Sequence, residues 1–494
     1  AVRRETTPRV IVTELDAVLA GQAAHWREPA FDEELYACHL SATAAESPFL
    51  RLAYTSWITP ARVLDVSAAT GEVHLRRETE VPGYDPADYV AERVWAPASE
   101  PSSVTGEDVR IPVTVIRHRD VKPDGTAPCV VYGYGSYEMS MDPVLGVARL
   151  SLLDRGVVFA VAHVRGGGEL GRRWYEDGKK LAKRHSFTDF VDATRHLVDL
   201  GWADPARVAC MGGSAGGLLM GAVLNLAPEL YRACLAVVPF VDALTTILDP
   251  ELPLSALEWE EWGNPIEDAA VYEAMRAYTP YENVRAVDYP AIAAVTSLHD
   301  TRVLYVEPAK WVQQLRRTVT SDQSTPLAQG GAPVLLKTEM DGGHGGASGR
   351  YRAWEDRAWD YAFILTALGA TELTAGDFVR WCKQTIDLLE QLEIGAGERA
   401  VAGHVGHDPA HEREQHPRAL DHQKRMHLVL GHALDVEHAG IVQLAQEQGR
   451  LGGGVGRGDL ELGDDLVLVL GRPLARVQPD LHRDLRLHFG TGKA

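Results

Sequence analysis

The sequence lacks the features that mark a disulfide-stapled, membrane-spanning or nucleic-acid-binding protein. Its five cysteines are odd in number and widely spaced, with no CxxC pair. Neither a disulfide framework nor a zinc site is indicated, and a reducing, cytoplasmic compartment is expected. No run of 18 apolar residues and no signal-peptide pattern occurs, so we expect no membrane partner. The net charge of −20 argues against a nucleic-acid partner and is compatible with a cationic one.

What is present is ordinary for a globular protein. Hydrophobic residues make up 45% of the 494 residues and charged residues 24%, and this length has room for two or three domains. The chain begins with Ala1 rather than Met, and we therefore expect a segment to precede it.

Residues 1–80 are typical of short strands separated by turns. The runs at 49–57, 61–69 and 72–78 are strand-like, and the sequences TP and ATGE between them are turn signals. This spacing suits a sheet meander or a blade of a propeller, but the segment is too short to close a propeller by itself.

Residues 81–370 alternate between buried strands and helices. Apolar strand-like runs are expected at 128–135, 156–164, 207–214, 232–240, 290–298 and 333–340, and helices at 187–201, 216–227, 307–318 and 350–369. Apolar runs that are buried on both faces and alternate with helices predict an α/β fold with a doubly wound, mostly parallel sheet.

Residues 371–494 have a different composition. An amphipathic helix is expected over 372–393, but the hydrophobic period is poor after residue 400, and ten of the 19 histidines fall between His404 and His488. No tight ligand set or HExxH motif occurs among these histidines, so no metal is expected. We expect this tail to be chimeric or disordered, and dispensable to the preceding domain.

The motif Gly212-Gly213-Ser214-Ala215-Gly216 fits the pattern G-x-S-x-G. A predicted strand enters it and a predicted helix leaves it, which is the context of a nucleophilic serine on a tight turn. The alternative is a glycine-rich turn that cradles a phosphate. The backbone N–H of Ala215 would supply one donor to an oxyanion, and a second donor is expected from residues 130–140.

An aspartate and a histidine follow the serine in the order that a nucleophile elbow requires. Asp300 comes just after the run 290–298, and His344 lies in a glycine-rich loop after 333–340. Either residue alone would be read as a solvated loop residue. Together, at the ends of strands of one sheet, they predict that His344 takes the proton of Ser214 and that Asp300 orients the imidazole.

Several long stretches resemble the oligopeptidase B branch of the prolyl oligopeptidase family. Among them are VVYGYGSYEMSMDP, GGSAGGLLMGAVLNLAPELY, EWEEWGNP and DGGHGGASGR, and the likeness runs from about residue 45 to 369. The resemblance implies an α/β-hydrolase domain over 81–370, with 1–80 as the last one or two blades of a β-propeller. It also implies a serine endopeptidase without a cofactor, which cleaves short basic peptides after Arg or Lys.

The resemblance also assigns roles to individual residues. It implies the triad Ser214, Asp300 and His344, and it makes the hydroxyl of Tyr134 the second oxyanion donor. Glu258 and Glu260 match the acidic pair that receives the basic side chain of the substrate.

Two further matches concern the neighbouring subsites. Asp142 matches an acidic subsite residue, although the family often has a second acid two residues later, where Val144 stands here. Arg302 matches an arginine that contacts the substrate backbone.

Other interpretations stay open at this point. Residues 376–392 resemble the C-terminal helical domain of Ski2-like RNA helicases, which supports a chimeric tail. The chain could be a non-catalytic remnant that keeps the motifs, or an esterase or aminopeptidase on the same scaffold. The sequence does not indicate the oligomeric state.

Overall fold

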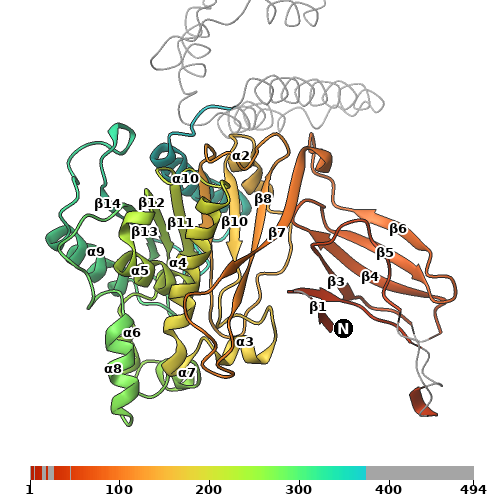
Figure 1. Ribbon diagram of the computed structural model, residues 1–494, viewed down its shortest axis with the longest axis horizontal. Coiled ribbons are helices and arrows are strands. Elements are labelled where there is room, and N and C mark those ends of the chain that lie inside the picture. The colour runs from red at the N-terminus through yellow and green to blue at the C-terminus, as the bar shows by residue number, and fades with distance from the viewer. Residues whose placement is uncertain (1, 5, 14–17, 21–26, 45, 374–494) are drawn as a thin grey trace, which may run out of the picture. The chain divides into compact units, whose positions relative to one another are not determined.

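An eight-stranded sheet with helices over both faces forms the larger part of the structure (Figure 1). The computed structural model describes residues 2–373, apart from 5, 14–17, 21–26 and 45. In their order across the sheet, the strands are β14 (Val334–Glu339), β13 (Ala291–Ser297), β12 (Ala233–Val237), β11 (Val208–Gly213), β9 (Cys129–Tyr132), β10 (Val158–Ala162), β8 (Arg110–His118) and β7 (Tyr89–Pro97).

The sheet is mixed but mostly parallel. The strands from β14 to β10 pair in parallel with their neighbours, whereas β8 is antiparallel to both β10 and β7. The chain adds β10 on one side of β9 and then β11 on the other. The strand order therefore reverses between β9 and β11, and in open α/β sheets the ligand crevice lies outside the carboxyl ends of the strands at such a point.

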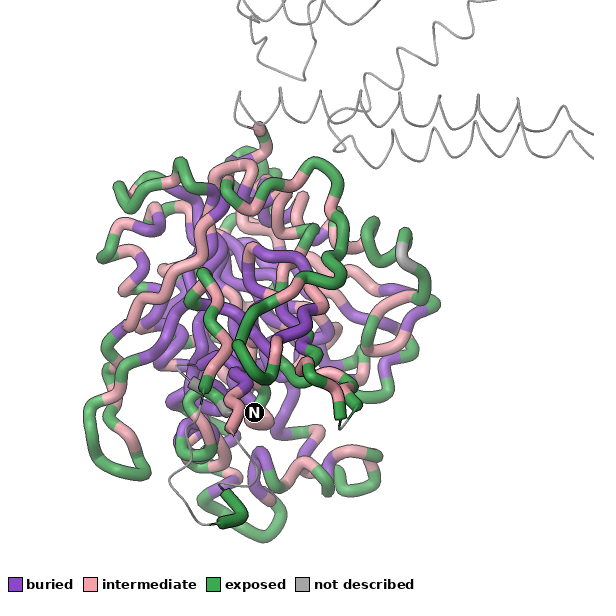
Figure 2. Tube along the Cα trace, turned by 90° about the vertical axis from the view of Figure 1, so that its right-hand side faces the viewer, coloured by how far each residue is buried: buried purple, intermediate pink, exposed green. Residues whose placement is uncertain are grey.

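The parallel strands are buried on both faces, as the continuous apolar runs predict. In β9, Cys129 and Val131 belong to one hydrophobic core, while Val130 belongs to another on the opposite face. This division follows from the alternation of side chains along a strand. Figure 2 shows the buried centre beneath exposed loops.

The helices divide between the two cores. They are α2 (Leu150–Leu153), α3 (Arg172–Glu176), α4 (Arg184–Asp199), α5 (Ala215–Leu226), α6 (Ala243–Ile247), α7 (Ser255–Trp262), α8 (Ala269–Tyr278), α9 (Val306–Thr318) and α10 (Arg350–Leu368). Single-turn 3-10 helices lie at η1 (Pro86–Asp88), η2 (Val147–Arg149), η3 (Lys180–Ala182), η4 (Pro228–Leu230) and η5 (Leu327–Gln329). Residues of α4, α5 and α9 pack into the first core, and residues of α2 and α10 into the second.

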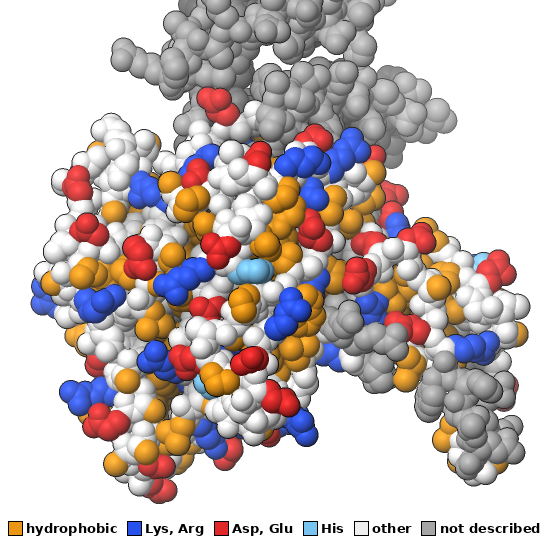
Figure 3. All heavy atoms as spheres, in the orientation of Figure 1, with side chains coloured by type: hydrophobic (Ala, Val, Ile, Leu, Met, Phe, Trp, Pro, Cys, Tyr) orange, Lys and Arg blue, Asp and Glu red, His pale blue; other side chains and the backbone are white. Residues whose placement is uncertain are grey.

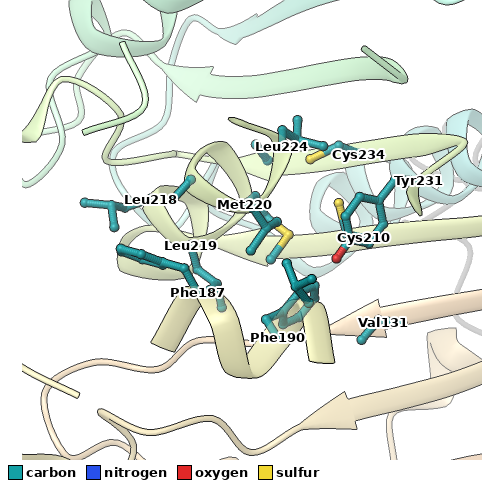
Figure 4. Packing of buried hydrophobic residues seen from close by; sticks show 14 of the residues in the cluster. Val131, Phe187, Phe190, Cys210, Leu218, Leu219, Met220, Leu224, Tyr231 and Cys234 are labelled. Carbon is teal, nitrogen blue, oxygen red and sulfur yellow. The ribbon is translucent and has the colours of Figure 1, made fainter. Parts of the chain in front are cut away.

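Helix α5 is held deep in the first core. Figure 4 shows Phe187 and Phe190 of α4 beside Leu218 and Leu219 of α5, and all four are at most 1% exposed. Burying each of these side chains stabilises the fold by roughly 1.5–3 kcal/mol. The residue that precedes α5 is therefore anchored to a rigid element.

The N-terminal residues form a separate antiparallel sheet. Its strands are β3 (Tyr36–Leu40), β4 (Phe49–Ser56), β5 (Arg62–Ser67) and β6 (Val73–Glu78), and a short hairpin of β1 (Val2–Arg4) and β2 (Thr7–Arg9) precedes them. Leu52 and Leu64, which pair across β4 and β5, lie in a small core of their own. Four antiparallel strands are the content of one propeller blade.

Most of the predicted elements are confirmed. The three strands expected within 1–80 correspond to β4, β5 and β6, and the six apolar runs within 81–370 correspond to β9–β14. The four long helices correspond to α4, α5, α9 and α10. The predictions about 371–494 concern a segment that, from residue 374 onward, lies outside the described residues.

Two further observations concern the apolar helices and the surface charge of the described residues. None of the described helices is both long enough and apolar enough to cross a membrane. On the face drawn in Figure 3, acidic and basic side chains are interspersed among apolar ones.

Candidate active site

Ser214 stands on a strained turn between β11 and α5. Its φ of 57° and ψ of −119° lie outside the regions that residues with a side chain prefer. Two backbone hydrogen bonds hold this conformation: the N–H of Ser214 donates to the carbonyl of Val237 (2.9 Å), and the N–H of Phe240 donates to the carbonyl of Ser214 (3.1 Å). The turn thus places Ser214 at the carboxyl end of β11, at the edge of the sheet where the parallel strands end.

The glycines around Ser214 are required by the closeness of the backbone. A Cβ on Gly212 would lie 2.4 Å from the carbonyl oxygen of Gly216, and a Cβ on Gly216 would lie 2.7 Å from the carbonyl oxygen of Gly133. Both distances are shorter than a carbon–oxygen contact allows. The G-x-S-x-G pattern is therefore a packing requirement of this turn.

His344 joins Ser214 to Asp300. Its Nε2 lies 3.1 Å from Ser214 Oγ, and its Nδ1 lies 2.7 Å from Asp300 Oδ2. An ionised carboxylate only accepts hydrogen bonds, so the proton of the neutral imidazole is on Nδ1, and Nε2 is free to accept from the serine hydroxyl.

The backbone holds Asp300 in place. This residue follows β13 and is 3% exposed. Its Oδ1 accepts the backbone N–H groups of Arg302 (2.9 Å) and Val303 (3.0 Å). The carboxylate can therefore hold one orientation of the imidazole while its own charge is satisfied.

Two hydrogen-bond donors lie around the serine. Ala215 is the first residue of α5, so its N–H has no partner within the helix. Tyr134 follows β9 across the point where the strand order reverses. Burial raises the pKa of Tyr134 to about 12, although a hydrogen bond with Ser214 acts in the opposite direction. Its hydroxyl is therefore protonated at neutral pH and can donate.

The two glutamates predicted to form an acidic pocket point in different directions. Oε2 of Glu258 accepts hydrogen bonds from the Tyr137 hydroxyl and from Trp262 Nε1, both at 2.7 Å. The side chain of Glu260 is 89% exposed and lies 3.3 Å from Lys180 Nζ. Two positions along a helix correspond to a rotation of about 200°. Helix α7 therefore does not bring these two carboxylates together.

Glu258 is nevertheless close to the serine. The rings of Tyr137, which donates to Glu258, and Tyr134 are 6.4 Å apart, and the Glu258 charge contributes to the raised pKa of Tyr134. Trp262, the other donor, packs against Phe240, whose N–H bonds to Ser214. A half-buried carboxylate therefore lies in an aromatic wall beside the candidate nucleophile.

A buried ion pair supports this wall and was not predicted. Glu261 accepts a hydrogen bond from the Tyr175 hydroxyl (2.7 Å), and one of its oxygens lies 3.7 Å from Lys183 Nζ. Lys183 also donates to Ser136 Oγ (2.7 Å) and to the carbonyl of Gly135 (2.5 Å). Burial lowers the pKa of Lys183 to about 8, with Glu261 acting in the opposite direction. The sequence places Glu261 in an acidic run and gives no sign of its burial.

The two remaining predicted site residues, Asp142 and Arg302, are at least partly exposed. Asp142 is one-third exposed and pairs with Arg3 Nη1 at 2.6 Å. Arg302 is exposed, and its backbone N–H supports Asp300. No group of three His, Cys, Asp or Glu side chains that could hold a metal ion occurs within the described residues.

Comparison with known proteins identifies the fold around this serine. Residues 145–371 match the sequence profile described as the prolyl oligopeptidase family. The matched segment contains Ser214, Asp300 and His344.

Two curated relatives extend the match beyond this segment. The chain is 49% identical over 339 residues to dipeptidyl aminopeptidase BI of Pseudoxanthomonas mexicana, a match that covers 68% of this chain and 45% of the relative. It is 43% identical over 350 residues to Protease 2 of Moraxella lacunata, which covers 70% of this chain and 48% of the relative. The chain thus spans about half the length of these two relatives.

Two solved structures are similar to this chain over three quarters of its length. Oligopeptidase B from Leishmania major matches with a TM-score of 0.68 and 41% identity, over 75% of this chain and 50% of that one. Oligopeptidase B from Trypanosoma brucei with covalently bound antipain, in its closed form, matches with a TM-score of 0.67 and 38% identity, over 75% and 51%. The expected fold class, an α/β-hydrolase with a mostly parallel sheet, is confirmed.

Proposed function

We propose that this chain hydrolyses peptide bonds through an acyl-enzyme formed on Ser214. One observation carries the proposal: His344 lies within hydrogen-bond distance of both Ser214 Oγ (3.1 Å) and Asp300 Oδ2 (2.7 Å). A serine hydroxyl is a poor nucleophile until a base takes its proton, and a correctly oriented neutral imidazole is that base.

The first half of the reaction forms the acyl-enzyme. Ser214 Oγ attacks the carbonyl carbon of the scissile bond while its proton passes to His344 Nε2. The N–H of Ala215 and the hydroxyl of Tyr134 stabilise the oxyanion that develops. His344 then gives the proton to the leaving amine as the carbon–nitrogen bond breaks. The charge of Asp300 stabilises the imidazolium between these two transfers.

The second half of the reaction regenerates the enzyme. Water attacks the ester carbonyl and passes a proton to His344 Nε2, and the imidazolium returns that proton to Ser214 Oγ as the acyl group leaves. The same two donors stabilise the second oxyanion. No cofactor takes part in either step of this proposal.

We further propose that the residue before the scissile bond is Arg or Lys, and that Glu258 receives its cation. Both hydrogen bonds to Glu258 go to Oε2, which leaves Oε1 for a guanidinium or ammonium. A half-buried carboxylate in an aromatic wall suits an arginine, because its planar guanidinium can both pair and stack. Glu260 would then contribute only to the long-range field of the pocket.

A substrate panel tests the reaction and its specificity. We expect the chain to release aminomethylcoumarin from benzyloxycarbonyl-Arg-aminomethylcoumarin, with kcat/KM far above that for the Ala counterpart. Ser214→Ala should lose activity by several orders of magnitude and should no longer react with a fluorophosphonate probe. If the unmodified chain does not react with that probe, it is a non-catalytic remnant.

A second candidate function is dipeptide release, favoured by the 49% identity to a dipeptidyl aminopeptidase. A carboxylate that accepts a guanidinium can also accept the N-terminal amine of a substrate. Gly-Arg-aminomethylcoumarin and its N-acetylated form separate the two functions. An endopeptidase cleaves both forms, whereas a dipeptidyl aminopeptidase cleaves only the form with a free amine. An esterase on this scaffold would cleave neither and would hydrolyse acyl esters alone.

A further inference from the structure

A cavity of about 460 Å³ borders the second core, on the side of the sheet where α2 and α10 pack. Its wall is largely aromatic and apolar, with side chains that include Trp57, Tyr132, Phe159, Met211 and Tyr361. These residues come from the loop after β4, three strands of the central sheet and α10. Cavities of this size and lining accept small organic molecules.

One cation in this wall has no acidic partner. Within the described residues, no carboxylate lies within ion-pair distance of the Arg149 guanidinium, and its hydrogen bond is a long one of 3.4 Å from Nη1 to the carbonyl of Val144. The guanidinium carbon lies 4.6 Å from the ring centroid of Phe159 and 5.2 Å from that of Trp57. Burial lowers the pKa of Arg149, although an arginine still keeps its charge at neutral pH.

The other charges of the wall are already paired. Arg357 lies 3.4 Å from a carboxylate oxygen of Asp360, one helical turn further along α10. Asp142 pairs with Arg3 at 2.6 Å. Arg149 therefore leaves the cavity with an excess positive charge, and a partly buried charge without a counter-ion is costly.

We propose that this cavity binds a small organic acid, whose carboxylate pairs with Arg149 and whose apolar body lies against Trp57 and Phe159. A planar guanidinium accepts a carboxylate through two parallel hydrogen bonds. Tyr132 and Tyr361 line the same cavity, and a tyrosine hydroxyl can donate to an anion. The proposal does not depend on the hydrolase activity, because it concerns binding alone.

Three probes of one shape and different charge test the proposal by isothermal titration calorimetry on the full 494-residue chain. Phenylbutyrate carries the carboxylate, phenylbutyramide is neutral, and phenylbutylamine is a cation. We expect phenylbutyrate to bind about tenfold or more tightly than the amide, since a hydrogen bond to a charged group is worth about 1.5–3 kcal/mol. The cation should bind more weakly still.

Substitutions in the cavity locate the binding site. Arg149→Gln should reduce the affinity for phenylbutyrate to that for the amide. Arg173→Gln, at an exposed arginine of α3, should leave it unchanged. Ala148→Phe, which adds bulk in the wall of the cavity, should weaken the binding of both the acid and the amide. The melting temperature of each variant without probe reports whether it folds.

Three results would overturn the proposal. Equal binding of the acid and the amide, or tighter binding of the cation, would mean that Arg149 does not select an anion. Unchanged binding of phenylbutyrate to the folded Arg149→Gln variant would place the acid elsewhere. Absence of binding by all three probes to the unmodified chain would show that the cavity does not take this class of ligand.

Discussion

Lys183 and Glu261 form an ion pair of 3.7 Å in which both side chains are almost fully buried, 1% and 3% exposed. Lys183 also holds the loop that follows Tyr134, through Gly135 and Ser136. Glu261 belongs to α7, which carries Glu258. The pair therefore fastens the loop that carries a proposed oxyanion donor to the helix that carries the proposed substrate carboxylate.

Breaking this pair should destabilise the protein strongly. Glu261→Gln removes the counter-ion of Lys183 and leaves the buried amine with one partner fewer, which should cost about 1–3 kcal/mol. Urea denaturation measures the change in the free energy of unfolding. Glu260→Gln, which removes an exposed carboxylate from the same helix, is the control and should change it by less than about 1 kcal/mol. Equal effects of the two variants would contradict the structural role of the buried pair.

The same lysine predicts how stability changes with pH. Burial lowers the pKa of Lys183 to about 8, whereas an unfolded lysine titrates near 10.4, about two units higher. Between these values the unfolded chain binds more protons than the folded one, so the contribution of Lys183 to the free energy of unfolding increases with pH. Below pH 8 the buried charge lowers stability by about 3 kcal/mol relative to the neutral amine.

The Lys183→Met variant has no titratable group at this position, so comparison with it isolates the contribution of Lys183 to the pH dependence of stability. As the pH rises from 8 to 10, we expect the free energy of unfolding of the unmodified protein to increase relative to that of the variant. Urea titrations at several pH values give both curves. Curves that stay parallel would show that Lys183 does not titrate in this window.

Tyr134→Phe should lower kcat by about 10²–10³, because the hydroxyl is proposed to donate to the oxyanion. KM should change little, since the ring remains. Steady-state assays with the arginyl coumarin substrate measure kcat and KM. Tyr351→Phe, at an exposed tyrosine of α10, is a matched control that should keep full activity. A Tyr134→Phe variant with normal kcat would remove the hydroxyl from the mechanism.

Glu258→Gln and Glu260→Gln should separate the two candidate specificity residues. The first removes a half-buried charge in the aromatic wall, and we expect the preference for Arg over Ala to fall by an amount equivalent to about 2–5 kcal/mol in kcat/KM. The second removes an exposed charge paired with Lys180 and should change the preference by no more than a few fold. The reverse order would mean that α7 turns on binding substrate.

Gly216→Ala should destabilise the protein by about 1–3 kcal/mol or more, because the new methyl group meets the backbone of Gly133 rather than a movable side chain. Thermal unfolding measures the loss. Gly345→Ala is the control, since a Cβ there meets nothing within 4 Å. If both variants have the same melting temperature, the turn is looser than its geometry indicates.

The parallel strands and the arrangement of Ser214, Asp300 and His344 could be predicted from the sequence because both leave local signals. A strand buried on both faces reads as a continuous apolar run, and Ser214, Asp300 and His344 each follow one of these runs. The antiparallel strands β7 and β8 were not predicted. β7 contains Glu92 and Arg93 and is mostly half-buried, and β8 contains a proline, so neither resembles an uninterrupted buried run.

The surroundings of the triad depend on directions that the sequence does not record. Glu258, Glu260 and Glu261 are near neighbours in one acidic run, yet one is half-buried, one is exposed and one is buried. The rotation of α7 about its own axis, relative to the loop after β9, decides which of the three carboxylates is buried and which is exposed. The cavity beside Arg149 is still less predictable, since its wall joins Trp57 to Tyr361 across some 300 residues of chain.

The strained backbone of Ser214 lowers the stability of the fold at the residue that is proposed to carry the reaction. A residue with a side chain at this position stores about 1–3 kcal/mol of strain, which glycine would relieve. A library of variants selected only for survival on heating would therefore enrich Ser214→Gly, and the most stable variants recovered would lack the proposed nucleophile. Laboratory evolution of this chain needs selection for turnover in every round.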